Sequence, residues 1–399
     1  MTLQTAAALP ASTTPIPTNR LTSLDGLRGV AALVVMLHHI YLVAKPTLVS
    51  AGGSAPGSVY WVVSETPLKL VTAGSEAVLV FFVLSGLVVA LPALRKPGFS
   101  WTGFLTGRMV RIYLPVWASL AIGTALIWLL PRDQSVVTAG SWMSQSNATA
   151  VTPSTLWGQM SLTAVSYDIN NVLWSLRWEL IFSVLLPLFV AVAQVVRRRW
   201  LLAGAVAFIL ILLGTLAHID ALKYLPVFFI GTLLAVRLDS INEWTRQRLK
   251  RPRATLWGII LVVGVLLLLV ARWWAGSLAS FGTLSDSVLR LMPVLGAAGL
   301  VWAAIGVPFL RRALDSRPGQ WLGRISFSLY LIHIPILATL TFVLGDHKWW
   351  LVAVLTVPVA LVAAWGFYRV IERPSHRLAR YTSQITARAT AKFRARVSR

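Results

Sequence analysis

The stretch LDGLRGVAALVVMLHH, residues 24–39, contains both features on which the fold depends. Its centre, Val30–Leu37, is entirely apolar, whereas Arg28 and His39 stand on either side of it. Arg28 and His39 are eleven residues apart, so at about 100° per residue they share one face of a helix. The rise between them is about 16 Å at 1.5 Å per residue. The stretch therefore predicts a membrane helix with an arginine near the cytoplasmic surface and a histidine well inside the bilayer.

Comparable apolar stretches recur almost to the end of the chain of 399 residues. Hydrophobic residues make up 57% of it, charged residues 12%, and the mean hydropathy is +0.73. A soluble domain carries about twice that share of charge. Ten stretches have roughly the 17–25 residues needed to cross a bilayer. We therefore expect an all-α polytopic membrane protein with about ten transmembrane helices. They are placed near 24–44, 74–94, 112–130, 171–195, 200–217, 221–236, 254–271, 288–308, 321–344 and 349–370. Only His218, Ile219 and Asp220 separate the fifth from the sixth.

The charge of the chain is strongly positive, with 36 Lys and Arg against 13 Asp and Glu, a net +23. If the N-terminus is cytoplasmic, 28 of the 36 cations fall on cytoplasmic segments, as membrane topology favours. We therefore expect both termini in the cytoplasm of a multi-pass plasma-membrane protein. Residues 1–19 are expected to form a disordered tail, 20–380 the transmembrane domain, and 381–399 a basic tail near anionic headgroups. Nucleic-acid binding has no further support, because neither a stacking motif nor zinc-ligand spacing is present.

Ionisable residues inside membrane spans are informative, because each costs about 2.5–3.5 kcal/mol on insertion scales. Glu179 in the fourth span and His333 in the ninth fall at a depth similar to that of His39 when helical rise is counted. Three helices thus place ionisable groups at one level, which indicates a polar centre. Purely structural roles remain open: Glu179 could pair with a cation, and His333 could orient Tyr330. The absence of cysteine excludes disulfides and thiol nucleophiles.

Several polar motifs occur in a fixed order along the chain and lie in or beside the spans. They are LDGLRG followed by His39, FFVLSG at 81–86, Arg108-x2-Arg111, WSL-x2-Glu179, LGRIS…LYL…His333 at 322–333, and ERP at 372–374. In this combination the chain resembles the acyltransferase 3 family of integral-membrane O-acyltransferases, from about Leu24 to Pro374. Many members carry a carboxylate just before the two phenylalanines. Here Leu79 fills that position, and Glu76 lies three residues earlier.

The resemblance implies an acyl-CoA donor at the cytoplasmic side and transfer to a hydroxyl group. Acceptors in the family include cell-envelope polysaccharides, glycolipids, peptidoglycan and macrolides. The family's Arg-x10-His motif maps onto Arg28 and His39, and its Arg-x2-Arg motif onto Arg108 and Arg111. Acetyl is the commonest acyl group of the family. Neither a permanently bound cofactor nor a metal ion is expected.

These residues suggest a mechanism. CoA phosphates would contact Arg28, Arg108 and Arg111, because the guanidinium fork suits phosphate. His39 would act as general base, with Glu179 as the best carboxylate to orient it. Direct transfer and a transient acyl-histidine both remain open. Further substrate-binding candidates are Ser85, Trp174, Tyr330 and His333. Ser85 also has a structural reading, since Ser85-Gly86 could be a close-packing pair.

Two other functions are less well supported by the sequence. A polyprenyl-linked glycosyltransferase would call for paired carboxylates in the outer loops, where only scattered Glu65, Asp133 and Asp168 occur. A lipid or glycan transporter predicts inverted repeats and broken helices in matching halves, which the sequence does not clearly contain.

Overall fold

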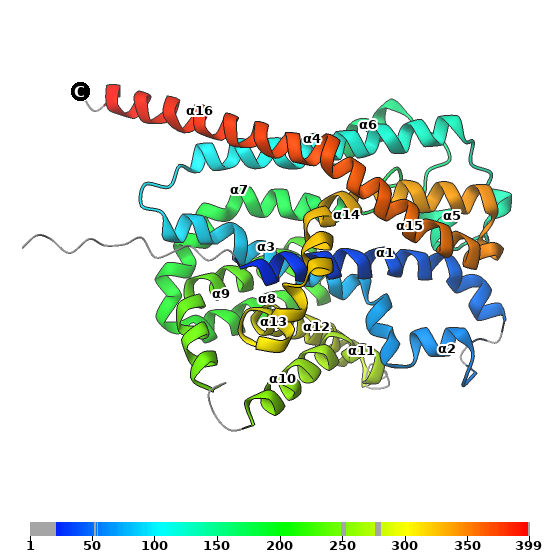
Figure 1. Ribbon diagram of the computed structural model, residues 1–399, viewed down its shortest axis with the longest axis horizontal. Coiled ribbons are helices and arrows are strands. Elements are labelled where there is room, and N and C mark those ends of the chain that lie inside the picture. The colour runs from blue at the N-terminus through cyan, green and yellow to red at the C-terminus, as the bar shows by residue number, and fades with distance from the viewer. Residues whose placement is uncertain (1–20, 52, 54, 249–252, 276–280, 398–399) are drawn as a thin grey trace, which may run out of the picture.

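The computed structural model describes residues 21–397, apart from 52, 54, 249–252 and 276–280 (Figure 1). Within these ranges the chain is almost entirely helical and contains no strand. The proposed tail at 1–19 lies outside the described residues. The main helices are α1 (Thr22–Ser50), α2 (Val59–Ser64), α3 (Gly74–Arg95), α4 (Trp101–Leu129), α5 (Trp142–Ser146), α6 (Pro153–Met160), α7 (Leu173–Val195), α8 (Trp200–Leu216), α9 (Asp220–Arg248), α10 (Ala254–Leu269), α11 (Ala271–Trp274), α12 (Thr283–Gly306), α13 (Pro308–Leu314), α14 (Arg317–Leu344), α15 (Trp349–Phe367) and α16 (Arg373–Val397).

Each of the ten expected spans coincides with a helix, which confirms an all-α polytopic membrane protein. In the described part of the chain, eight helical stretches are long and apolar enough to cross a membrane. One of them, Leu173–Leu216, contains the expected fourth and fifth spans, and α10 is shorter, with 16 residues. The break between α8 and α9 is real. It centres on His218, whose φ of +56° is a left-handed conformation that no helix can continue through.

The long helices lie side by side, and the short helices α2 and α5 lie at one end of the bundle (Figure 1). Helix α16 reaches past the bundle at the opposite end. Two helices extend furthest beyond the expected spans: α4 starts eleven residues earlier than 112, and α9 continues twelve residues past 236. A hydropathy window misses such ends, because their polar turns lower its average although the backbone remains helical.

Helices α1 and α14 pack closely through glycines of the LDGLRG and LGRIS motifs. A Cβ atom built on Gly29 would lie 2.5 Å from the backbone nitrogen of Gly323, and one on Gly323 would lie 2.4 Å from the oxygen of Asp25. No real side chain tolerates such contacts, so small residues are required for the helices to approach. This crossing fixes the position of α1 relative to α14, and with it that of His39 relative to His333.

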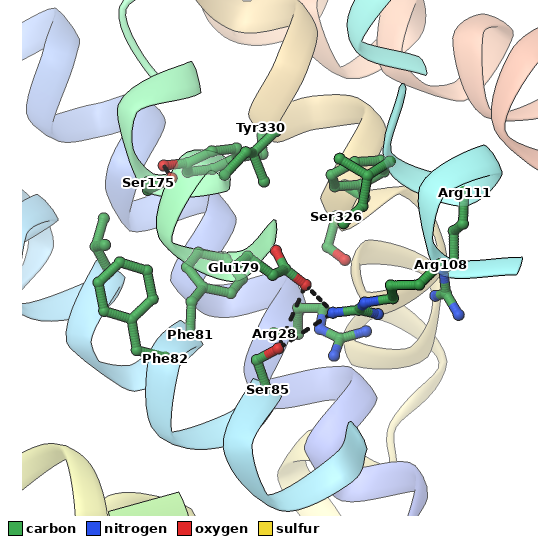
Figure 2. Close-up of a pocket in the computed structure, with 14 residues that line it drawn as sticks. Arg28, Phe81, Phe82, Ser85, Arg108, Arg111, Ser175, Glu179, Ser326 and Tyr330 are labelled. Carbon is green, nitrogen blue, oxygen red and sulfur yellow. Dashed lines mark hydrogen bonds and ion pairs between the residues drawn. The ribbon is translucent and has the colours of Figure 1, made fainter. Parts of the chain in front are cut away.

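A second close crossing joins α3 to α9. A Cβ atom on Gly86 would lie 2.0 Å from the backbone oxygen of Phe228, and one on Gly231 would lie 2.1 Å from that of Val83. The close-packing role expected for the Ser85-Gly86 pair is therefore confirmed for Gly86. The neighbouring Ser85 points instead into the interior cavity described below (Figure 2).

The segment between α4 and α7 covers the end of the bundle that carries α5 and α6. Its folding depends on side-chain to backbone hydrogen bonds, because it contains little regular structure of its own. Arg132 Nη1 donates to the Ala148 oxygen at 2.6 Å, and the Thr138 amide donates to Asp346 Oδ2 at 2.6 Å. Burial lowers the pKa of the Arg132 guanidinium to about 10. Trp142 of α5 extends from this segment towards the bundle interior and contacts His39.

Candidate active site

A buried ion pair lies at the centre of the bundle. Arg108 of α4 donates from Nη2 to Glu179 Oε1 of α7, and the two side chains are only 11% and 26% exposed. Ser85 of α3 donates to the same carboxylate oxygen at 3.3 Å, and Arg108 Nε donates to Ser183 Oγ at 3.1 Å. The carboxylate and the guanidinium therefore satisfy each other where neither could be solvated by lipid. Of the two readings left open for Glu179, the structural pairing with a cation is present, and the cation is Arg108.

An interior cavity of about 80 Å³ surrounds this pair (Figure 2). Arg28, Arg108 and Arg111 lie on one side of it, and Tyr330 with Ser175 on the other. The Tyr330 hydroxyl and Ser175 Oγ are hydrogen-bonded at 2.6 Å. The remaining lining residues are mostly apolar: Val78, Phe81, Phe82, Ser85, Ile112, Leu176, Glu179, Ser326 and Phe327. The cavity is thus a narrow, largely apolar space with cations at one end.

A larger vestibule, of about 790 Å³, adjoins the interior cavity. Arg28, Arg108 and Arg111 line both spaces, so these three residues form the junction between them. The sequence motifs Arg-x10-His and Arg-x2-Arg therefore come together in space, although they belong to different helices. Within the described chain, neither Arg28 nor Arg111 has a salt-bridge partner, so their charges face the two cavities.

His39 and His333 form a second polar pair inside the bundle. His333 Nε2 lies 3.1 Å from His39 Nδ1, and both side chains are buried. Each Nδ1 atom also lies close to a backbone oxygen of the preceding turn, Val35 for His39 at 2.9 Å and Leu329 for His333 at 2.8 Å. The expectation that these two histidines lie at one level of the bundle is therefore confirmed.

Glu179 is not part of the histidine pair. Its carboxylate faces Arg108 and Ser85, and no hydrogen bond joins Glu179 to His39. Tyr330 lies between the two groups, because it lines the interior cavity while its ring centroid is 6.2 Å from that of His333. Phe81 packs against the Tyr330 ring at 5.6 Å. These two rings therefore separate the arginine–glutamate centre from the histidines.

Trp174 does not line the interior cavity. It packs in an aromatic cluster behind it, with ring centroids 6.3 Å from Phe82 and 5.4 Å from Tyr224. His38 turns away from His39, and its Nδ1 lies 2.7 Å from the Thr72 oxygen, which points to a structural role for this histidine. The ring of Trp142 lies 5.1 Å from His39 on the side of α5 and α6.

The sequence analysis missed several polar residues around these cavities. Ser183 and Ser175 lie on α7, one turn to either side of Glu179, so helical spacing from Glu179 would have found both. Arg373, Arg377 and Arg380 line the vestibule from α16; Arg373 belongs to the ERP motif, but none of the three was predicted to bind a substrate. Glu372, whose Oε2 accepts a hydrogen bond from Ser328 at 2.5 Å, is the buried carboxylate of the ERP motif.

The chain is similar to known proteins over most of its length. The family model described as an acyltransferase domain matches residues 21–369. Acyltransferase MdmB of Streptomyces mycarofaciens is 27% identical, with 90% of this chain and 92% of that protein covered. Nodulation protein 10 of Rhizobium leguminosarum bv. viciae is 25% identical, with 76% and 83% covered. O-acetyltransferase PaAT-1 of Phomopsis amygdali is 25% identical, with 81% and 73% covered. No solved structure matches the chain.

The family match includes every site helix from α1 to α15 and ends at residue 369, before the ERP motif and α16. It decides between the classes of protein that the sequence left open, and it favours neither a glycosyltransferase nor a transporter. The motif residues predicted from the sequence come together in two adjoining cavities and one histidine pair, with the exception of Trp174. The chain belongs to the acyltransferase 3 family of membrane O-acyltransferases.

Proposed function

We propose that the protein transfers an acyl group from cytoplasmic acyl-CoA to a hydroxyl group of a cell-envelope glycan, a glycolipid or a secreted metabolite, at the plasma membrane. The observation that carries this proposal is the junction of two cavities at Arg28, Arg108 and Arg111. One cavity is wide and basic, and the other is narrow and mostly apolar. Acetyl is the acyl group we favour, and the name of the O-acetyltransferase relative supports it.

The parts of CoA match the two cavities in the order in which they follow one another along the molecule. Its phosphates carry the negative charge and need a wide basic site, whereas its pantetheine arm is thin and only weakly polar. Arg28 and Arg111 have no salt-bridge partner among the described residues, so they can make charge-assisted hydrogen bonds to phosphate oxygens. The arm would then pass the three arginines and bring the thioester into the interior cavity, beside Phe81 and Tyr330.

His39 is the general base in this proposal. Its Nε2 takes the proton of the acceptor hydroxyl while the hydroxyl oxygen attacks the thioester carbonyl carbon. The carbon–sulfur bond breaks, the acyl group stays on the acceptor oxygen, and the proton passes from His39 to the leaving CoA sulfur. The rings of Tyr330 and Phe81 separate the interior cavity from His39, so the donor's carbonyl must reach His39 past them.

The acceptor would approach from the end that carries α5 and α6. Trp142 contacts His39 from that side, and an indole ring offers a flat apolar face to a sugar or a macrolide ring. The donor and the acceptor would therefore enter from opposite ends and meet near the histidine pair. Such an arrangement allows a cytoplasmic donor to modify an acceptor on the other side of the membrane.

Radiolabelled acetyl-CoA tests this function directly. Purified protein in lipid nanodiscs is incubated with it and with envelope glycans, lipids and culture metabolites from cells lacking the gene. Label in one acceptor fraction with wild-type protein, and none with the His39→Ala variant, would support the proposal. Equal labelling by both proteins would refute the role of His39. No turnover of acetyl-CoA with any acceptor fraction would refute the choice of donor.

A further inference from the structure

One wall of the vestibule is formed by α16, and the function proposed above gives this wall no role. Helix α15 continues through a π-helical turn, Tyr368–Glu372, into α16, so the chain runs on beyond the bundle (Figure 1). Single π turns within helices occur often at functional sites. Because of this continuation, the residues just after the ERP motif lie at the mouth of the vestibule rather than in a separate segment.

Helix α16 is held in place by α4. A Cβ atom on Gly103 would lie 2.6 Å from the Ser383 oxygen, and the Thr102 and Thr390 hydroxyls are 3.0 Å apart. These close contacts leave no freedom for α16 to roll on α4. One face of α16 is thereby fixed against the bundle, and the neighbouring face is fixed towards the vestibule.

Three arginines occupy that vestibule-facing side. Arg373, Arg377 and Arg380 have the spacing i, i+4 and i+7, which places them on one face of a helix. All three are exposed, and none forms a salt bridge within the described part of the chain. Arg388, Arg394 and Arg396 lie further along α16 and do not line the vestibule.

The charge of the vestibule is one-sided. Six arginines and His376 line it, and its described lining contains no Asp or Glu. Glu372 lies nearby: its Oε2 accepts a hydrogen bond from Ser328, and its Oε1 lies 3.6 Å from His376 Nε2. Arg108 is paired with Glu179, and the other five arginines have no salt bridge within the described part of the chain. Several like charges around one concave space repel one another unless an anion is bound between them. Three of the six also line the interior cavity, whereas those of α16 are confined to the vestibule.

We propose that α16 forms the binding site for the phosphate groups at the nucleotide end of the acyl donor, through Arg373, Arg377 and Arg380. The inference rests on the proposed use of acyl-CoA and assigns its parts to two sets of arginines. Arg28, Arg108 and Arg111 contact the phosphate nearest the arm, at the junction through which the arm passes, and α16 holds the remaining phosphates outside it. The same phosphate chemistry could come from an anionic lipid headgroup, and the test separates the two sources.

Binding of CoA and of pantetheine, which lacks the nucleotide phosphates, tests the assignment without an acceptor. Both ligands are titrated into the purified full-length protein in phosphatidylcholine nanodiscs. The test variant carries Arg373→Ala, Arg377→Ala and Arg380→Ala, and the matched control carries Arg388→Ala, Arg394→Ala and Arg396→Ala. Both remove three exposed arginines from α16, so any general effect of charge or helix stability is shared.

We expect the test variant to bind CoA about tenfold more weakly or worse, because each charge-assisted contact to phosphate is strong. Its affinity for pantetheine, and the control's affinity for CoA, should stay within twofold of wild type. An unchanged affinity for CoA, or an equal loss for both ligands, overturns the proposal. If the triple variant is not recovered as a monodisperse protein, Arg377→Gln alone should still lower the affinity for CoA, by a smaller factor, and leave that for pantetheine unchanged.

One further measurement and one further outcome separate the remaining explanations. The titrations are repeated in nanodiscs that contain phosphatidylglycerol. If wild type and test variant differ only when this anionic lipid is present, the arginines bind lipid headgroups and the proposal is wrong. If wild-type protein binds neither CoA nor pantetheine, the proposed donor itself fails. That outcome differs from normal CoA binding that the α16 substitutions leave unchanged, which would overturn only the role of α16.

Discussion

The hydrogen bond between the imidazoles of His39 and His333 has a defined direction, with His39 as the donor. His333 Nδ1, 2.8 Å from the Leu329 oxygen, must carry a proton to bond there, so Nε2 of the neutral ring is an acceptor. His39 Nδ1 lies 3.1 Å from that Nε2 and 2.9 Å from the Val35 oxygen. Both of these atoms are acceptors, so His39 carries its proton on Nδ1. The remaining nitrogen, His39 Nε2, is thereby left with a free lone pair, which is the state a general base requires.

Replacing His39 should therefore remove the chemistry and leave donor binding intact. We expect His39→Ala to lower the acyl-transfer rate by a factor of about 10² to 10⁴, the usual contribution of a general base. The affinity for CoA should stay within threefold, because the vestibule residues are untouched. Transfer rates with labelled acetyl-CoA and CoA titrations on the same preparation measure both quantities.

The neighbouring His38 provides the matched control. It is also a partly buried histidine of α1, but its Nδ1 faces the Thr72 oxygen and not His333. His38→Gln should retain most of the transfer rate, with at most a small loss of thermal stability from the altered hydrogen bond. A loss of transfer as large as that of His39→Ala would contradict the assignment of the base to one histidine.

His333 is expected to act as a positioning residue through His39. His333→Ala removes the acceptor that helps to hold His39 Nδ1, so the transfer rate should fall by about tenfold, as expected for the loss of one hydrogen bond worth about 1–1.5 kcal/mol. His333→Gln can place its Oε1 near the position of Nε2 and should restore part of the rate. The KM for acyl-CoA should be the same in both variants.

A merely structural role for His333 makes a different prediction. Loss of packing would lower the yield and thermal stability of both variants, and glutamine would not rescue the rate over alanine. A rise in the KM for acyl-CoA without a change in kcat would likewise place His333 in donor binding. Steady-state kinetics beside thermal unfolding of each variant distinguishes these outcomes.

Some relationships in the site could be predicted from helical geometry alone, whereas others depend on how the helices pack. The common depth of His39 and His333 could be predicted because every helical residue rises by the same amount. The partner of Glu179 could not be, because it depends on which helices are neighbours and how each is rotated about its axis. The α16 wall was missed for a similar reason. Arg373, Arg377 and Arg380 have helical spacing in the sequence, but only the packing of α16 on α4 turns them towards Arg28 and Arg111.

Replacing one member of the Arg108–Glu179 pair should lower the unfolding free energy more than replacing both. Either Arg108→Met or Glu179→Leu alone leaves one charge buried without its partner, and we expect a loss of about 3 kcal/mol of unfolding free energy. This is the low end for broken buried pairs, because Glu179 is 26% exposed. The double variant should recover part of that loss. Thermal or denaturant unfolding of all four proteins in one detergent gives the coupling energy.

The outcome of that cycle also bears on function. If Glu179 mainly neutralises Arg108, the double variant should be folded yet bind CoA more weakly than wild type, since it lacks one junction arginine. Additive losses in the double variant would mean that the two side chains are not energetically coupled. Their short contact would then contribute little to the stability of the bundle.

The α3–α9 crossing offers a test of the packing itself. Gly86→Ala places a methyl group 2.0 Å from the Phe228 backbone oxygen, and a backbone atom cannot swing aside as a side chain would. Overpacking of a tight interior costs about 1–3 kcal/mol, so the unfolding temperature should fall. The Ser85 side chain of the interior cavity should shift as the helices separate, and transfer activity should drop as well.

Gly204 of α8 is the matched control for this substitution. It is also a glycine within a membrane helix, but a Cβ atom there would meet nothing within 4 Å. Gly204→Ala should raise stability by about 0.5–1 kcal/mol, because alanine has the higher helix propensity. Opposite signs for the two glycine-to-alanine changes would support the close α3–α9 approach. If Gly86→Ala is as stable as wild type, the two helices must lie further apart than described, and the position of Ser85 beside Glu179 would have to be revised with them.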